Sequence, residues 1–194
     1  MTRKEITKLL TDTLINTRLS DRKYYAREVT LDYGTSDQKR VDVMQYSPEG
    51  VMYASDIERG EFTCYEVKSC KADLYSNHGL RFYGDRNYIV TTMDVWKNTI
   101  GPDLMQGTKL YDYVKDNYPE SSTEFGVMVL IPYSIDTSDA SRMMEEFKNP
   151  TPLSTDIRWT LWIAKPCRKC HRKRGTTELL FCMLRSKHNA TNAG

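Results

Sequence analysis

Two carboxylates and a lysine stand on segments of the chain that are typical of neighbouring strands. Glu66 and Lys68 belong to the segment 64–68, and Asp42 lies between two valines on an earlier segment. Side chains alternate between the two faces of a strand, so Glu66 and Lys68 share one face and Val67 occupies the other. If the two strands pair, we expect Asp42 and Glu66 to converge.

This set of side chains is typical of a site that hydrolyses phosphodiesters with the help of a metal ion. Two adjacent carboxylates repel each other, and one keeps its proton unless a cation is present. Mg²⁺ takes oxygen ligands, polarises a phosphate and lowers the pKa of a bound water. Lys68 can orient that water or balance charge on the phosphate. The alternative is an ion pair between Glu66 and Lys68 on an exposed face of a sheet, and the spacing alone favours neither interpretation.

The same residues resemble the motif of the PD-(D/E)XK nuclease superfamily. The resemblance rests on Asp42, followed by Glu66-x-Lys68, after an N-terminal helix and a strand. The stretches 40–43, 65–74 and 85–90 are similar to the MmcB-like group within it, whose members are regarded as DNA-repair or phage-encoded nucleases. The resemblance covers roughly residues 3–132. It implies a restriction-endonuclease-like core, in which helices flank a mixed β-sheet.

The resemblance also implies a role for each residue. Asp42 and Glu66 would bind Mg²⁺ or Mn²⁺, the backbone carbonyl of Val67 would join them, and Lys68 would serve the attacking water. Some family members add an acidic residue from the first helix or strand. Glu28 is the candidate here, because the alternative, Glu5, stands in a helix-capping position.

Hydrophobic periodicity and turn residues predict the elements that position these residues. Apolar residues at helical spacing predict a helix over 3–19. Three strand-like segments, 24–31, 40–44 and 62–69, favour an antiparallel meander, with 53–60 as an extended turn between the last two. We expect further elements in the rest of the chain, namely helices at 71–76, 103–118, 138–148 and 176–185, and strands at 87–92, 125–131 and 157–164. This order predicts an α/β or α+β fold around a mixed sheet.

Positive charge is concentrated near the C-terminus. Between residues 165 and 188, eight Lys and Arg stand against one acidic residue, although the formal net charge of the whole chain is only +2. Such an asymmetry suits a polyanionic partner, which we expect to be DNA. The alternatives for these cations are a solvated surface, a flexible hairpin tip and a targeting signal. The candidate contacts to nucleic acid are Lys71, Arg86, and, in what we call the basic loop (residues 168–174), Arg168, Lys169, Arg172, Lys173 and Arg174.

Five cysteines in a chain that starts without an apolar export signal indicate reduced thiols in the cytoplasm. Cys167 and Cys170, followed by His171, have the spacing of zinc ligands, but a second cysteine pair is missing. A plain pair of thiols is therefore favoured over zinc, and haem attachment would need export. The longest apolar run, residues 127–131, is far shorter than the roughly 20 residues of a membrane span, so we expect no membrane association.

The sequence thus predicts a single nuclease-like domain over 1–194, with a basic strand-loop-helix element at 157–188. The preferred function is divalent-metal-dependent hydrolysis of DNA phosphodiester bonds, in DNA repair or phage biology. One alternative is a non-catalytic module of the same fold that binds nucleic acid or protein, for example a phage protein that interferes with a host complex. Another is a small zinc-stabilised interaction protein. Many nucleases of this fold form homodimers to cut both strands, and the sequence leaves the oligomeric state open.

Overall fold

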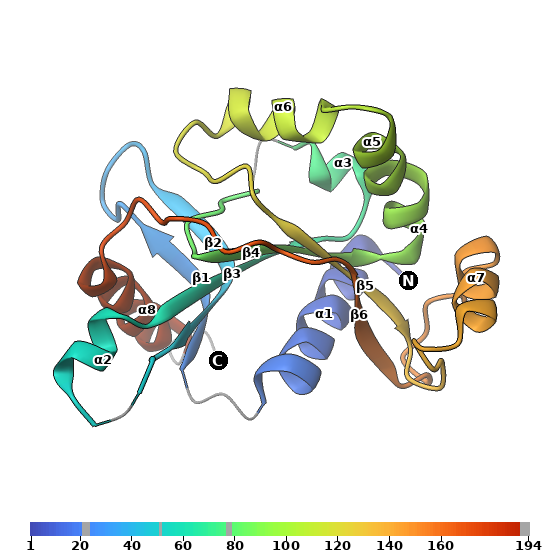
Figure 1. Cartoon of the computed structure of the whole chain (residues 1–194), viewed down its shortest axis with the longest axis horizontal. Helices are drawn as coiled ribbons and strands as arrows, with labels where there is room; N and C mark the ends of the chain where they lie inside the picture. The colour runs from blue at the N-terminus through green and yellow to red at the C-terminus, as the bar shows by residue number, and fades with distance from the viewer. Residues whose placement is uncertain (21–23, 51, 77–78, 191–194) are drawn as a thin grey trace.

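Six strands form one mixed sheet at the centre of the molecule (Figure 1). The computed structural model describes residues 1–20, 24–50, 52–76 and 79–190. The strands lie in chain order across the sheet: β1 to β3 form an antiparallel meander, β3 to β5 run parallel, and β6 returns antiparallel to β5. Their bounds are β1 Tyr25–Leu31, β2 Lys39–Ser47, β3 Glu61–Lys68, β4 Arg86–Thr92, β5 Gly126–Pro132 and β6 Trp159–Lys165. The predicted α/β fold around a mixed sheet is confirmed.

Helices cover both faces of this sheet (Figure 1). The first helix, α1, continues into a π-helical turn η1, and a second such turn, η2, joins α4 to α5. The bounds are α1 Arg3–Leu14, η1 Ile15–Leu19, α2 Ala54–Glu58, α3 Lys71–Leu74, α4 Met93–Val95, η2 Trp96–Ile100, α5 Gly101–Gln106, α6 Lys109–Asn117, α7 Ala140–Lys148 and α8 Thr176–Ala190. In the part of the chain that is described, no helix has the length and apolar character needed to cross a bilayer.

Two predicted elements differ from the structure. The single helix expected over 103–118 is two helices, α5 and α6, because the chain is extended at Gly107, with a φ of 168°. The extended turn expected at 53–60 contains the short helix α2. The carboxylate of Asp56 accepts hydrogen bonds from the backbone N–H groups of Met52 and Tyr53 and so closes the first turn of α2.

The helix α1 is fixed at its start by a capping box and along its length by apolar packing. Thr2 accepts a hydrogen bond from the N–H of Glu5, and the carboxylate of Glu5 accepts one from the N–H of Thr2 at 2.6 Å. The capping role predicted for Glu5 is confirmed. Leu10 and Leu14 are fully buried against the sheet, and each contributes roughly 1.5–3 kcal/mol by its burial.

Different helices cover the two faces of the sheet. In β3, Tyr65 and Val67 pack towards α1, whereas Phe62 and Cys64 pack towards α8, as the alternation of side chains along a strand requires. On the second face, α4 to α6 cover β4 and β5. Glu66 is in register with Ile89 of β4, and Ile89 packs under these helices. Glu66 and Lys68 therefore point away from α1.

Candidate functional site

Asp42 lies at the point where β2 and β3 separate. The paired part of these two strands ends at Val43 and Tyr65. Beyond it, Oδ2 of Asp42 accepts a hydrogen bond of 2.8 Å from the backbone N–H of Val67. In a strand the N–H and C=O of one residue point to the same neighbour, so the Val67 carbonyl also faces β2. The carboxylate of Asp42 and the carbonyl of Val67, two predicted metal ligands, therefore share one side of β3.

Glu66 is a fully buried carboxylate with one oxygen that lacks a hydrogen bond. Its Oε1 accepts a bond of 3.2 Å from the backbone N–H of Arg81. Among the described residues, no donor reaches its Oε2, and Nζ of Lys68 lies 3.8 Å from this atom. Glu66 has no exposed surface and Lys68 is 3% exposed. The alternative of an ion pair on an exposed sheet face is therefore wrong.

Burial makes it difficult for both carboxylates to be ionised. The pKa of Glu66 is raised to about 8, chiefly by the loss of solvent and also by the charge of Asp42, while Lys68 acts against both effects. Burial likewise raises the pKa of Asp42, against the charge of Lys68 and the N–H of Val67. One ammonium thus faces two desolvated carboxylates. The cluster is short of positive charge, and a divalent cation with oxygen ligands fits its donor set.

A glycine allows the chain to cover this cluster closely. Gly79 has a φ of +109°, and a Cβ atom at this position would overlap the ammonium of Lys68 and lie 2.8 Å from Oε2 of Glu66. Residues 79–81 therefore exclude solvent from Glu66 and Lys68, and the N–H of Arg81 holds one carboxylate oxygen in place. Only glycine fits this position without displacing the lysine.

A groove of about 470 Å³ opens from Asp42 to the surface between α1 and β1. Asp42 and Val67 line it, whereas Glu66 and Lys68 do not. Basic side chains dominate the walls, although the sequence analysis did not single them out. The lining residues from the two walls are Arg3, Lys4, Thr7, Lys8 and Thr11 of α1 and Arg27 and Glu28 of β1. The spacing of the α1 residues, which places them along one helix face, is the signal that could have predicted this wall.

Glu28, the predicted additional ligand, stands opposite Asp42 in the register of β1 and β2 but does not pair with it in the ladder. Its φ of +52° interrupts the regular strand. The side chain lines the groove and forms an ion pair of 2.8 Å with Arg40. Burial raises the pKa of Glu28, and the charge of Asp42 adds to this effect. Glu28 is thus close enough to Asp42 for the charge of Asp42 to raise its pKa, but its carboxylate already forms an ion pair with Arg40.

The basic loop lies at the other end of β3. Lys169 and Arg86 both pair with Glu61, the first residue of β3, at 2.6 and 3.3 Å. Seven residue steps, or roughly 23 Å, separate Glu61 from Lys68. The predicted nucleic-acid contacts of Arg86 and of the loop are therefore not at the Asp42 cluster, whereas Lys71 is exposed at the start of α3, three residues after Lys68.

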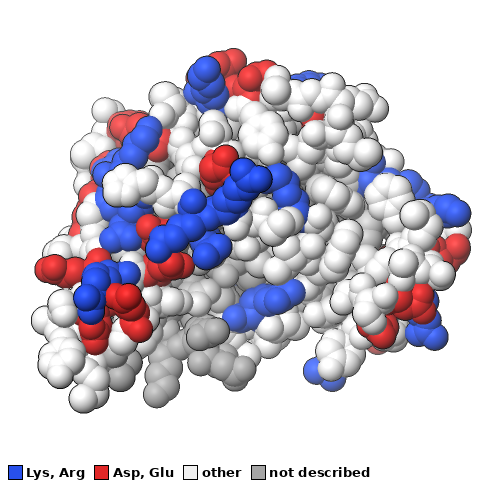
Figure 2. Space-filling model, in the orientation of Figure 1, with Lys and Arg blue, Asp and Glu red and all other residues white. Residues whose placement is uncertain are grey.

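Acidic side chains of the body neutralise much of the charge of this loop. Arg172 pairs with Asp85 at 2.7 Å, and Arg174 pairs with Asp32 at 2.8 Å. Figure 2 shows Lys and Arg side chains next to Asp and Glu side chains on the left of this face. Of the other two loop cations, Lys173 donates to a backbone carbonyl and Arg168 is exposed. Ion pairs connect the loop to the body of the domain, an arrangement that favours a packed loop over a flexible hairpin tip.

Cys167 and Cys170 are free thiols that share one buried neighbour. The backbone N–H of Asn87 donates to Sγ of Cys167 at 3.3 Å, and the side-chain amide of Asn87 donates to Sγ of Cys170 at 3.5 Å. Over the described ranges, no three His, Cys, Asp or Glu side chains gather as metal ligands. A cation at Asp42 and Glu66 would therefore complete its coordination with the Val67 carbonyl and water.

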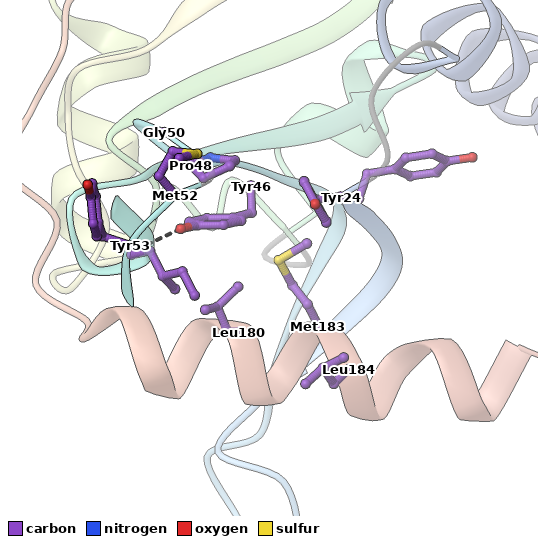
Figure 3. A pocket seen from close by; sticks show the side chains of 11 residues that line it. Tyr24, Tyr46, Pro48, Gly50, Met52, Tyr53, Leu180, Met183 and Leu184 are labelled. Atoms are coloured by element: carbon purple, nitrogen blue, oxygen red, sulfur yellow. Dashed lines mark hydrogen bonds between the residues drawn. The ribbon is translucent and has the colours of Figure 1, made fainter. Parts of the chain in front are cut away.

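A second cavity, of about 390 Å³, lies between α8, α2 and the ends of β1 and β2 (Figure 3). Its lining is apolar and aromatic, and it includes Tyr24, Tyr53 and Met183. The hydroxyl of Tyr46 is occupied by a hydrogen bond of 2.6 Å to the carbonyl of Ile57. Its described lining residues include no carboxylate or cation, so they lack the groups that phosphodiester hydrolysis needs.

Among the residues predicted from the sequence, the structure brings together Asp42, Glu66, Val67 and Lys68, and it places Glu28 at the edge of the same groove. Comparison of the chain with protein-family models, with curated proteins and with solved structures gave no match. The resemblance to the PD-(D/E)XK nucleases, and to the MmcB-like group among them, therefore stays a prediction.

Proposed function

We propose that this protein hydrolyses DNA phosphodiester bonds with the help of a divalent metal ion. One observation carries the proposal: the carboxylate of Glu66 is fully buried, and one of its oxygens has no hydrogen-bond donor among the described residues. The negative charge of Asp42 acts on this carboxylate, and the ammonium of Lys68 lies 3.8 Å from the same oxygen. An unpaired buried charge is costly, and such groups are normally paired or ligate a metal. The arrangement therefore suits a cation more than it suits a structural ion pair.

In this proposal Asp42, Glu66 and the Val67 carbonyl would hold Mg²⁺ or Mn²⁺. When bound, the ion supplies a Lewis acid for the phosphate and lowers the pKa of a water. Lys68 is the ammonium nearest to Glu66, where it holds a water in place and balances negative charge on the phosphate. Residues 79–81 keep bulk water away from this side of the cluster.

A second function, binding of nucleic acid without hydrolysis, is favoured by a different observation. Glu66 and Lys68 have almost no exposed surface, and the groove reaches only Asp42 and Val67. A substrate phosphate would meet Lys68 only after the cover over Glu66 moves. A protein that kept this cover closed would bind DNA in the groove and leave it intact.

The test is cleavage of a panel of single-stranded, duplex, nicked and branched DNA with Mg²⁺ or Mn²⁺. Asp42→Asn and Glu66→Gln should abolish both metal binding and cleavage. Lys68→Ala should keep metal binding and lower cleavage by roughly a hundredfold or more, because it removes a group that acts on the water and not on the metal. Lys148→Ala, in the Glu-x-Lys triplet of α7, is the matched control and should cleave like the wild type.

Activity that survives in Glu66→Gln would assign the cleavage to another site or to a contaminant. Absence of cleavage of every substrate by the wild type, with DNA still bound, would favour the non-catalytic function.

A further inference from the structure

We infer that the groove between α1 and β1 binds the phosphates of a single nucleic-acid strand, with Arg3 on one wall and Arg27 on the other. This inference rests on the proposed function, because the groove ends at Asp42. It moves the nucleic-acid interface from the basic loop, where the sequence placed it, to the N-terminal helix and the first strand.

The charge of the groove is the first argument. Four cationic side chains line it, from Arg3, Lys4, Lys8 and Arg27, against the two carboxylates of Glu28 and Asp42. The carboxylate of Glu28 already forms an ion pair of 2.8 Å with Arg40, which is not one of the lining residues. Lys8 pairs with Asp12 at 2.5 Å and Arg3 with Asp73, whereas Lys4 and Arg27 form no ion pair within the described residues. Phosphate oxygens are the groups that such exposed cations attract.

The position of Arg3 is the second argument. One guanidinium nitrogen of Arg3 donates to Oδ1 of Asp73 at 2.6 Å. Asp73 is only 8% exposed, and its other oxygen accepts bonds from both the N–H and the hydroxyl of Ser69. A buried carboxylate thus holds Arg3 at the rim of the groove, while the remaining N–H donors of the guanidinium stay available for a phosphate.

The size of the groove and the residues that line it are the third argument. Its volume of about 470 Å³ lies within the range of roughly 300–1,000 Å³ that is usual for small-molecule sites, so the groove can hold part of one strand but cannot enclose a duplex. A strand held by Arg27 and Arg3 would pass over Asp42 and the Val67 carbonyl. The phosphates bound by the two arginines would then flank the one presented to the carboxylates.

The experiment measures binding of a fluorescent single-stranded oligonucleotide in EDTA, so that cleavage plays no part. Each phosphate contact on a single strand contributes about 0.7 to the slope of log K against log salt. Arg3→Ala and Arg27→Ala should each lower this slope by about 0.7 and weaken binding roughly fivefold at 0.1 M salt. Both side chains are exposed, so neither change should prevent folding. Lys115→Ala on α6, across the sheet from α1, is the matched control and should bind like the wild type.

Two results would overturn the inference. One is a wild-type slope in both arginine variants, together with a reduced slope when Arg168 and Lys173 of the basic loop are replaced by Ala. The other is binding to duplex DNA alone. Binding that follows the predicted slopes, without any cleavage in Mg²⁺, would support the groove as the binding site and refute the hydrolytic function. Cleavage that neither arginine variant affects would support hydrolysis and refute the groove as the binding site.

Discussion

Glu66→Gln should change the pH dependence of stability in the metal-free protein. The folded state raises the pKa of Glu66 from 4.5 to about 8, chiefly by burial. Between these values the folded protein keeps a proton that the unfolded chain has lost, so stability is greatest at low pH and falls as the pH rises. At 1.36 kcal/mol per pH unit, the difference between the two pKa values corresponds to about 5 kcal/mol. Each state is half ionised at its own pKa, so about 4 kcal/mol of this is lost between pH 4.5 and pH 8.

Gln has the shape of the protonated acid and does not titrate, so Glu66→Gln should lack this loss. The difference in unfolding free energy between variant and wild type should therefore move in favour of the variant by about 4 kcal/mol from pH 4.5 to pH 8. Urea unfolding in EDTA across this range measures it. The change in the difference with pH is informative even if the amide makes poorer hydrogen bonds, because that penalty is the same at every pH.

Glu5→Gln is the matched control. The N–H and hydroxyl of Thr2 lower the pKa of Glu5, so its contribution has the opposite sign: it is present above pH 4.5 and is lost as the pH falls. Parallel pH profiles for wild type and Glu66→Gln would refute the reasoning, because they would mean that Glu66 ionises in the folded protein as freely as in the unfolded chain.

Three further predictions concern the metal, the cover and the basic loop. Mg²⁺ affinity should rise with pH up to about pH 8 and then level off, because the ion must displace the proton of Glu66, and calorimetry in buffers of different ionisation heat should detect that proton. Gly79→Ala should lower the unfolding free energy by more than 1 kcal/mol in urea, because the position has a positive φ and the new Cβ would overlap Lys68. Gly107→Ala, where a Cβ would meet open space, should destabilise the protein much less, and equal losses in the two variants would contradict the close cover. Replacement of Arg172 and Arg174 by Ala should lower the melting temperature and leave the salt slope of DNA binding unchanged, because their guanidinium groups are committed to Asp85 and Asp32.

The parts of the fold that depend on local pattern could be predicted from the sequence. The capping box at Thr2 and the leucines of α1 are such cases, since both are set by residues three or four positions apart. The strand at 125–131 is another such case: its nearly continuous apolar run is typical of a strand buried on both faces, and every residue of β5 is buried. The break between α5 and α6 was missed because the apolar residues on either side of Gly107 continue the helical stripe.

The candidate site was predictable in its acidic part and not in its basic part. Asp42 and Glu66 stand on adjacent strands of one meander, so strand alternation and pairing were enough to bring them together. The groove depends on a contact between Arg3 and Asp73, which are 70 residues apart. The basic loop looked like a free polycation because the carboxylate that pairs with Arg174, on Asp32, lies 142 residues away. Charge clusters along a sequence do not reveal which charges the fold neutralises.

The most direct test of the central claim is anomalous diffraction from a crystal soaked in Mn²⁺. The account predicts one strong peak bounded by the carboxylates of Asp42 and Glu66 and the carbonyl of Val67, and no peak there in Glu66→Gln. A soaked wild-type crystal without a peak at this place, with Glu66 still covered by residues 79–81 and its Oε2 still without a partner, would contradict the claim that these carboxylates form a metal site.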